Sequence, residues 1–509
     1  MLKQIIVSED EYEDRVALLE DNELTEIFSE RKESDYILGH VYKGRVNSVL
    51  PGMQVAFVDI GLPRNAFLHI SDVHREFNEF GEWSQQEESN PKSKTARKGT
   101  RHSINDLLKK GQEILVQIDK ESIGTKGPRV TAYVTLPGRY LVLMPTVENI
   151  GVSRKIEDEA ERRRLKELVL KLRKENNGYI VRTAAEGKSE SEFIAEMNFL
   201  TKHWEQISRR SESLSAPALV QDDLGLIFRV LRDIFTKEVS EFVIDSKDEY
   251  HKVTDYLDST LPNLKSRVKL YEEREPIFET YGVEKAIRRA LRRKIWLKCG
   301  GYIIIEQTEA MISVDVNTGK YVGKQDPDDT ILKANLEAVK EITRQIRLRD
   351  IGGIIVIDFI DMDNENHRKM VFRELKEALK RDRSKTNILA FTELGLVEMT
   401  RQRTKPSLTK MLCQPCPYCN GYGSILSEET VTIDLLRAIK KAYYRTEQKN
   451  LKVIANDIIA MRLLQEDANK VQKLEETLNV KLEIAGDIDV HMEEYRIISL
   501  NDNREIYLD

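Results

Sequence analysis

Two segments of the sequence carry polar side chains at the end of apolar, β-branched runs. In residues 312–319, ISVDVNTG, the alternation of side chains along a strand places Asp315 and Asn317 on one face. In residues 352–362, GGIIVIDFIDM, Asp358 follows an apolar run. If these strands are neighbours, two carboxylates and an amide meet at one sheet edge, where such oxygen ligands suit Mg²⁺, an ion that activates water and orients phosphates. The alternative is that the carboxylates cap the helices that follow.

An alternating pattern of helices and strands surrounds these segments. It predicts a basic helix over 285–298, a strand over 302–316, a helix over 330–348, a strand over 352–360, a helix over 367–382 and a strand over 387–391. This order predicts an α/β layer with a substantially parallel sheet, and helices on both faces of the strand that ends near Asp358. Strand alternation places Asp361 on the opposite face from Asp358, so we leave Asp361 outside the predicted site.

The composition allows several domains and limits the class of protein. The chain has 509 residues, of which 33% are charged and 40% hydrophobic, and its formal net charge is -6. This charge argues against a uniformly basic nucleic-acid binder but permits a local basic channel, for which 285–298 is one candidate; a solvated helix face is the alternative. The first residues lack a signal-peptide pattern, and no apolar run approaches the ~18 residues of a membrane span. We therefore expect a cytoplasmic protein without a membrane span.

Short strands punctuated by turn residues predict a small β-barrel over residues 36–128. In its segments VAFVDIG and NAFLHI, alternation places Phe57 and Phe67 on the polar sides of neighbouring strands. Exposed aromatic side chains on such a barrel stack on single-stranded bases, unless another domain covers them. Farther along, Arg182 and the adjacent Thr183 can hold a phosphate, although an isolated pair of this kind is usually ordinary surface.

The four cysteines are Cys299, Cys413, Cys416 and Cys419. The last two have the C-x-x-C spacing at which two thiolates can bind one Zn²⁺. A structural zinc site takes four ligands, however, and no histidine follows at zinc-finger spacing. The simplest arrangement is a two-fold axis through the metal, with Cys416 and Cys419 donated by each protomer. Cys413 is left open as a third ligand, a backup or a mere neighbour, and Cys299 is expected to be a buried small hydrophobe. Reduced free thiols and, less readily, a disulfide are the alternatives.

These motifs, together with LGLVEMTRQRTKPSL at 394–408 and CPYCNGYG at 416–423, resemble the ribonuclease E/G family of bacterial endoribonucleases. Their order and spacing agree along nearly the whole chain. The layout is closest to bacterial ribonuclease G, because members of the E type carry a long, disordered, Pro-rich and charged extension that scaffolds other decay enzymes. We therefore expect no such degradosome scaffold tail after Asp509.

The resemblance implies a multidomain α/β and α+β fold. The implied domains are an RNase H-like domain (1–35 and 215–280), an inserted S1-type OB-fold RNA-binding domain (36–128), a 5′-sensor domain (129–214), a DNase I-like α/β catalytic domain (281–400), a zinc link (401–425) and a small α/β C-terminal domain (426–509).

The resemblance also implies a Mg²⁺-dependent endoribonuclease that hydrolyses single-stranded RNA and leaves 5′-phosphate and 3′-hydroxyl ends. The expected substrates are AU-rich segments of ribosomal RNA precursors and messages. Asp315 and Asp358 match the family's metal ligands, one Mg²⁺ per active site, and Asn317 matches a residue that supports them by hydrogen bonding. Two other classes stay open: a non-catalytic RNA-binding protein, against which the intact site argues, and a metal-dependent nuclease acting on DNA or a small phosphodiester.

The family's binding positions can be carried over residue by residue. Its RNA contacts match Phe57, Phe67 and Lys126, and its pocket for a stimulating 5′-monophosphate matches Arg182, Thr183, Gly138 and Val142. A further family contact to that pocket falls at Lys385, where arginine is commoner. Lysine cannot donate two parallel hydrogen bonds to a phosphate as arginine does, which puts this contact in doubt. The cysteine segment matches the family's link that joins two protomers through one structural Zn²⁺. A homodimer is therefore expected, and dimers that pair into tetramers are left open.

Overall fold

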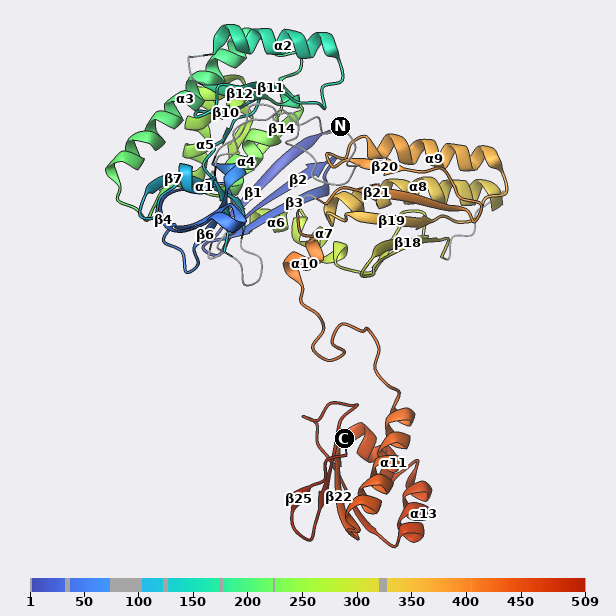
Figure 1. Cartoon of the computed structure of the whole chain (residues 1–509). Coiled ribbons are helices and arrows are strands. Elements are labelled where there is room, and N and C mark those ends of the chain that lie inside the picture. Colours follow the sequence, from blue (N-terminus) through green and yellow to red (C-terminus); the bar gives the residue numbers. More distant parts are fainter. Residues whose placement is uncertain are drawn as a thin grey trace. The chain divides into compact units, whose positions relative to one another are not determined.

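The computed structural model describes residues 2–32, 37–73, 103–121, 127–173, 177–222, 225–319, 327–403 and 405–508 (Figure 1). The chain forms two compact units, Met1–Leu408 and Thr409–Asp509, which are described separately. Among the residues that the structure describes, no helix combines the length and the apolar character needed to cross a membrane.

The first sheet of the larger unit joins the N-terminus to a segment far along the chain. Its strand order is β15-β14-β1-β2-β3, and β1 pairs in parallel with β14. The strands are β1 (Lys3–Glu9), β2 (Glu13–Glu20), β3 (Glu23–Arg31), β14 (Val239–Ile244) and β15 (Val268–Leu270). The helices that follow or flank these strands are α4 (Leu226–Asp233), α5 (Lys247–Thr260) and α6 (Ile277–Thr280).

A closed barrel of five strands is inserted after β3, as the sequence predicts. The strands are β4 (Val41–Leu50), β5 (Val55–Asp59), β6 (Ala66–His69), β7 (Glu113–Lys120) and β8 (Arg129–Thr131). The pairing of β4 with β7 closes the barrel, and β13 (Ala218–Gln221) adds to the outside of β4. The short helix α1 (Ile104–Leu107) precedes β7, and its first residue, Ile104, is buried in the barrel core.

A four-stranded sheet with two helices follows the barrel. Its order is β11-β12-β10-β9. The elements are β9 (Leu136–Pro137), β10 (Leu141–Met144), β11 (Ile150–Val152), α2 (Glu159–Leu172), β12 (Gly178–Val181) and α3 (Glu190–Ser213).

The six-stranded sheet that carries the predicted metal ligands has the order β16-β17-β18-β19-β21-β20. Its strands are β16 (Lys294–Trp296), β17 (Tyr302–Gln307), β18 (Met311–Asn317), β19 (Gly353–Asp358), β20 (Thr386–Ile388) and β21 (Leu396–Arg401). Its helices are α7 (Val283–Ala290), α8 (Pro327–Leu348) and α9 (Glu365–Leu379).

The prediction of a substantially parallel sheet is wrong. Only the β18–β19 pairing is parallel among the described strands of this sheet; the other pairings are antiparallel. The stretch predicted as one strand over 302–316 folds back on itself as the hairpin β17–β18. The side chain of Thr308 closes this turn, because its hydroxyl donates to the Met311 carbonyl at 2.8 Å and accepts from the Met311 N–H at 3.1 Å.

The basic stretch 285–298 is also not a single helix. Helix α7 ends at Ala290, and β16 begins at Lys294. Ile295 lies opposite Ile303 of β17 and is buried, so cross-strand packing in the sheet outweighs the helical preference of the surrounding lysines and arginines.

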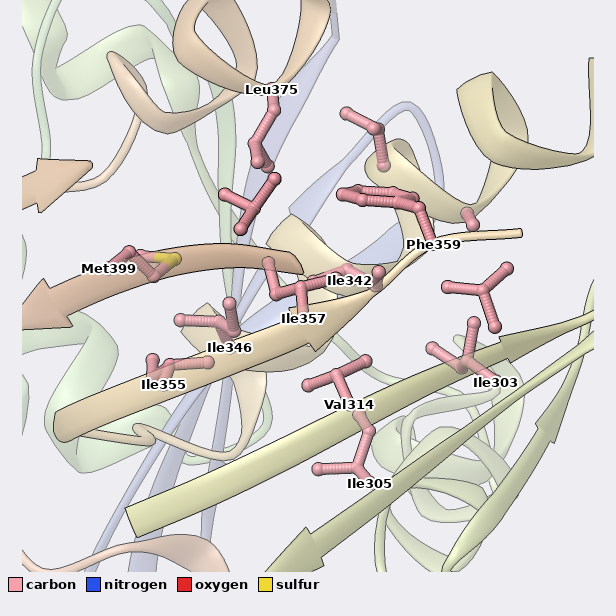
Figure 2. Packing of buried hydrophobic residues seen from close by; sticks show 14 of the residues in the cluster. Ile303, Ile305, Val314, Ile342, Ile346, Ile355, Ile357, Phe359, Leu375 and Met399 are labelled. Atoms are coloured by element: carbon pink, nitrogen blue, oxygen red, sulfur yellow. The ribbon is translucent and has the colours of Figure 1, made fainter. Parts of the chain in front are cut away.

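One face of this sheet is covered by helices. Figure 2 shows Ile342 and Ile346 of α8 and Leu375 of α9 in one cluster with Ile355 and Ile357 of β19, and all five side chains are buried. Their spacing of four along α8 presents one apolar stripe to the sheet. Each such side chain contributes roughly 1.5–3 kcal/mol through burial, which holds the strands in place.

In the part of the chain that the structure describes, the opposite face of the sheet is exposed to solvent, contrary to the expectation of helices on both faces. Ile354 of β19 and Trp296 of β16 are 51% and 54% exposed. Because strand side chains alternate, Ile354 shares its face with Asp358. The predicted metal ligands therefore lie on the open face.

The smaller unit has a four-stranded sheet of order β23-β22-β24-β25. Its strands are β22 (Asn450–Ala455), β23 (Lys481–Gly486), β24 (Tyr495–Ser499) and β25 (Arg504–Glu505), and its helices are α11 (Glu428–Thr446), α12 (Asp457–Leu464) and α13 (Ala468–Leu478). The boundary between the units falls within α10 (Leu408–Leu412).

Candidate active site

The structure brings the three predicted catalytic side chains together. Strand β18 pairs in parallel with β19, and Asp315 is the register partner of Asp358. Two positions along β18, the Asn317 amide donates a hydrogen bond from Nδ2 to Asp315 Oδ2 at 2.7 Å. Both carboxylates reach solvent, since Asp315 is partly exposed and Asp358 is exposed. The alternate strand residues Val314, Val316 and Ile357 are buried on the helix side of the sheet, so the polar row lies on the open side.

The electrostatics of the pair favour a bound cation. Burial and the negative charges of Asp315 and Asp361 raise the pKa of Asp358. The described part of the chain places no ion-pair partner against Asp315 or Asp358. Two adjacent carboxylates without a positive counter-charge, one of them held by an amide, form a donor set that suits Mg²⁺.

Asp361, which the prediction leaves outside the site, lies near Asp358 in the structure. Strand β19 ends at Asp358, so the alternation rule does not extend to Asp361. The negative charge of Asp361 raises the pKa of Asp358. Asp361 also lies close to Gly395, because its Oδ1 is 3.7 Å from the point where a Cβ atom on Gly395 would be. Asp361 therefore lies beside the turn that precedes β21, at the same end of the sheet.

The barrel presents the predicted pair of aromatic side chains. Phe57 of β5 is the register partner of Phe67 of β6. The two rings meet edge to face, with centroids 6.2 Å apart and an interplanar angle of 76°. Both side chains are partly exposed, while their strand neighbours Ala56 and Leu68 are buried in the barrel core. The third predicted contact, Lys126, lies outside the described residues.

Comparison with known proteins agrees with these features. The Ribonuclease E/G family model matches residues 135–404, the S1 RNA binding domain model matches residues 35–131, and the model of the RNase E/G, Thioredoxin-like domain matches residues 415–500. The chain is 42% identical over 477 residues to ribonuclease G of Escherichia coli (strain K12), a match that covers 93% of this chain and 95% of the relative. The chain belongs to the ribonuclease E/G family. The resemblance predicted from its motifs is thereby confirmed.

Two other relatives are similar to most of this chain. Ribonuclease G of Haemophilus influenzae is 43% identical over 459 residues, which are 90% of this chain and 91% of the relative. Ribonuclease E of Escherichia coli (strain K12) is 35% identical over 478 residues, which are 93% of this chain but 44% of that relative. The similarity to ribonuclease G thus covers most of both chains.

The structure also brings together the residues that the resemblance predicts to bind a 5′-monophosphate. Arg182 follows β12, and its Nη1 donates to the Gly138 carbonyl at 2.5 Å and lies 2.8 Å from Asp233 Oδ1. Thr183 is exposed beside it, and Val142 lies on the neighbouring strand β10. Burial raises the pKa of Asp233, but the Arg232 and Arg182 guanidiniums outweigh this effect and lower it. Lys385 is exposed directly before β20.

Sequence reasoning missed Glu196, which holds the turn that follows Gly138. The Glu196 carboxylate accepts hydrogen bonds from the backbone N–H groups of Arg139, Tyr140 and Leu141 at 2.5, 2.8 and 2.9 Å. Burial raises its pKa to about 7, although these three donors favour the ionised form. No local signal identifies Glu196, because it is one of several glutamates on the helix α3 and its partners lie on a distant turn.

The cysteine segment of the smaller unit presents two adjacent thiols. Cys416 is exposed, and its pKa is lowered by the backbone N–H groups of Cys419 and Tyr418 and by the Cys419 thiol. The Gly423 N–H donates to Cys419 Sγ at 3.3 Å. Hydrogen-bond donors beside a cysteine stabilise its thiolate, which is the form that binds a metal ion. The described residues contain no cluster of three or more candidate metal ligands, so Cys413 is not gathered with this pair.

Cys299 is only partly buried, whereas the sequence predicts a buried residue. It packs against the core of the six-stranded sheet, and burial raises the pKa of its thiol. It therefore acts as a small apolar residue.

Proposed function

We propose that this protein is a Mg²⁺-dependent endoribonuclease that hydrolyses single-stranded RNA, within ribosomal RNA precursors and messages, and leaves 5′-phosphate and 3′-hydroxyl ends. The observation that supports this proposal most strongly is the register pairing of Asp315 with Asp358 on the open sheet face of a ribonuclease E/G family member. In the same proposal the sheets correspond to the RNase H-like, 5′-sensor and DNase I-like domains that the resemblance implies.

The proposed roles follow from the donor atoms. Asp315 and Asp358 would hold one Mg²⁺, and the Asn317 amide holds the Asp315 carboxylate in its orientation. When bound, such an ion supplies Lewis acidity, which neutralises a phosphate oxygen and lowers the pKa of water. The strands supply the rigidity, because both ligands are fixed by the same parallel ladder and are supported from behind by α8 and α9.

Two further parts of the proposal concern the substrate and the assembly. Phe57 and Phe67 would stack on bases of a single strand, and Arg182 with Thr183 would bind a 5′-monophosphate and so stimulate cleavage. Cys416 and Cys419 of two protomers would share one structural Zn²⁺ and join a homodimer.

One assay tests the catalytic proposal. Single-stranded RNA and DNA of equal sequence are incubated with the protein in Mg²⁺ or in EDTA, beside the variants Asp315→Asn and Asp258→Asn. Asp258 is an exposed residue of α5 paired with Lys265, so its substitution is a matched control that removes a carboxylate remote from the site. We expect cleavage of RNA alone, abolished by EDTA and reduced about 100-fold or more by Asp315→Asn, because even outer-shell partners of a metal contribute 10- to 100-fold.

RNA cleavage that survives EDTA or the Asp315→Asn change would contradict the metal mechanism. Binding of RNA without any cleavage would indicate a non-catalytic RNA-binding protein. Equal cleavage of DNA would indicate a general nuclease. The product ends are read by ligation, which requires a 5′-phosphate and a 3′-hydroxyl.

A further inference from the structure

An aromatic pair lies on the same sheet face as the candidate catalytic residues. Trp296 of β16 is the register partner of Tyr302 of β17, and Tyr302 is in turn the partner of Asn317 on β18. By the same pairings, Lys294 lies in the row of Asp315. Register partners in antiparallel strands project to the same face, so this face carries two aromatic rings and a cation beside the polar row.

The pair is pre-organised and open to solvent. The rings of Trp296 and Tyr302 meet edge to face with centroids 5.4 Å apart. The Lys294 ammonium lies 3.4 Å from the Tyr302 ring centroid and 4.3 Å from the Trp296 ring centroid. Trp296 is nevertheless 54% exposed, while the adjacent Ile295 is 1% exposed on the other face. The fold therefore holds a large ring in place without burying it.

The ring lies within reach of a nucleotide at the candidate active site. Neighbouring strands are about 4.8 Å apart, so two strand spacings place Trp296 roughly 10 Å from Asn317 across the sheet. A base beside a phosphate at the Asp315–Asp358 pair would come over this part of the face.

The surroundings carry positive charge in a chain that is negative overall. Trp296 borders a groove of about 840 Å³ whose lining has seven lysine and arginine side chains against three glutamates. The lysines and arginines are Lys285, Arg289, Arg292, Lys294, Lys298, Lys340 and Arg344. The net charge of the chain is -6, so this excess of positive charge is local to the groove. A local positive groove complements the phosphates of a nucleic-acid strand.

We propose that Trp296, held by Lys294 and Tyr302, is a base-stacking residue that positions single-stranded RNA across the Asp315–Asp358 pair. This inference rests on the proposed function and adds a second stacking point to the barrel pair Phe57 and Phe67. A π-face exposed on a rigid strand binds any unpaired base, whereas a base inside a duplex cannot reach it.

The test measures stacking directly. A single-stranded oligoribonucleotide, carrying the fluorescent base 2-aminopurine at one position in turn, is bound to the full chain in the Asp315→Asn background, so that the RNA stays intact. We expect fluorescence quenching at one or a few positions next to the scissile bond. Trp296→Ala should abolish this quenching and weaken RNA binding about 5- to 150-fold, the range for loss of one base–aromatic stack.

Three comparisons make the result specific. Trp296→Phe retains a π-face and should restore most of the quenching, whereas Trp296→Leu retains apolar bulk against Tyr302 and should not. Tyr12→Ala removes another exposed aromatic ring, 75% exposed and located between β1 and β2, and should leave binding unchanged. Duplex RNA of the same sequence should bind equally to the parent and to Trp296→Ala.

The inference is overturned if Trp296→Ala binds and quenches like the parent, if Trp296→Leu performs as well as Trp296→Phe, or if duplex binding falls by the same factor. Failure of the proposed function shows separately, as undiminished RNA cleavage by Asp315→Asn. In that case the quenching is read by stopped flow within the first milliseconds after mixing, before cleavage, so that it still decides the role of Trp296.

Discussion

Asp315 and Asp358 are register partners in the parallel pairing of β18 with β19, and burial together with neighbouring negative charge raises the pKa of Asp358. When no cation is bound, repulsion between the two ionised carboxylates destabilises the folded chain. A bound cation removes this repulsion, so the same pair can serve as a metal-binding site. This relationship leads to the first prediction.

Metal ions and the Asp358→Asn change should have opposite effects on stability. In EDTA, Asp358→Asn should leave the melting temperature unchanged or raise it by about 2 °C, because it removes like-charge repulsion. In Mg²⁺ the parent should gain stability and the variant should not. Differential scanning calorimetry in both buffers measures this. A variant that melts lower in EDTA and still responds to Mg²⁺ would show that Asp358 has a structural role only.

Phe57→Ala should weaken the binding of single-stranded RNA by about 1–3 kcal/mol, the contribution of one base–aromatic stack. The fold should persist, because Phe57 is partly exposed and the barrel core lies on the other side of β5. Binding is measured by fluorescence anisotropy and folding by circular dichroism. An unchanged affinity would remove this ring from the RNA-binding surface.

Arg182→Lys should reduce the preference for RNA with a 5′-monophosphate about 10-fold, because lysine replaces a forked, charge-assisted contact with a single point charge. Cleavage of the same RNA with a 5′-hydroxyl should not change. Arg163→Lys, an exposed position on α2, is the matched control. Equal rates on the two RNAs with the parent protein would refute 5′-end sensing itself.

The melting temperature should depend on pH through Glu196. Its pKa is raised from 4.5 to about 7 in the folded chain, so the folded state binds a proton more tightly than the unfolded state. The stabilisation is complete below about pH 4.5 and is lost as the pH rises through about 7, a change of about 3 kcal/mol. The melting-temperature advantage of the parent over Glu196→Gln should therefore shrink between pH 5 and pH 8. Parallel curves for the two proteins would contradict this assignment.

Replacing both Cys416 and Cys419 with serine should release zinc and shift the protein toward monomer, since each protomer supplies half of the four-ligand site. Cys413→Ser should change neither zinc content nor mass, because Cys413 is not gathered with the pair. Metal analysis and analytical ultracentrifugation provide the measurements, with one zinc per two chains expected. One zinc per chain, or a dimer that survives the double change, would exclude a shared site.

Local patterns in the sequence determined which side chains share a face. The apolar alternation of ISVDVNTG and GGIIVID predicts two strands, and it places Asp315 beside Asn317 whatever the strands pair with. The sequence alone also predicts other features that depend on residues a few positions apart. These are the apolar stripes of α8 and α9, the short strands of the barrel and the C-x-x-C spacing of Cys416 and Cys419.

The tertiary structure decided what those faces meet. Strand direction in the six-stranded sheet, the open face at Ile354 and the strand formed by Lys294–Trp296 all depend on pairing between distant segments. Glu196 reaches a turn more than fifty positions away, and no periodicity encodes that contact. Local propensity is worth tenths of a kcal/mol per residue, whereas burial against a distant partner is worth up to about 3 kcal/mol per side chain, so the long-range contacts determine the arrangement.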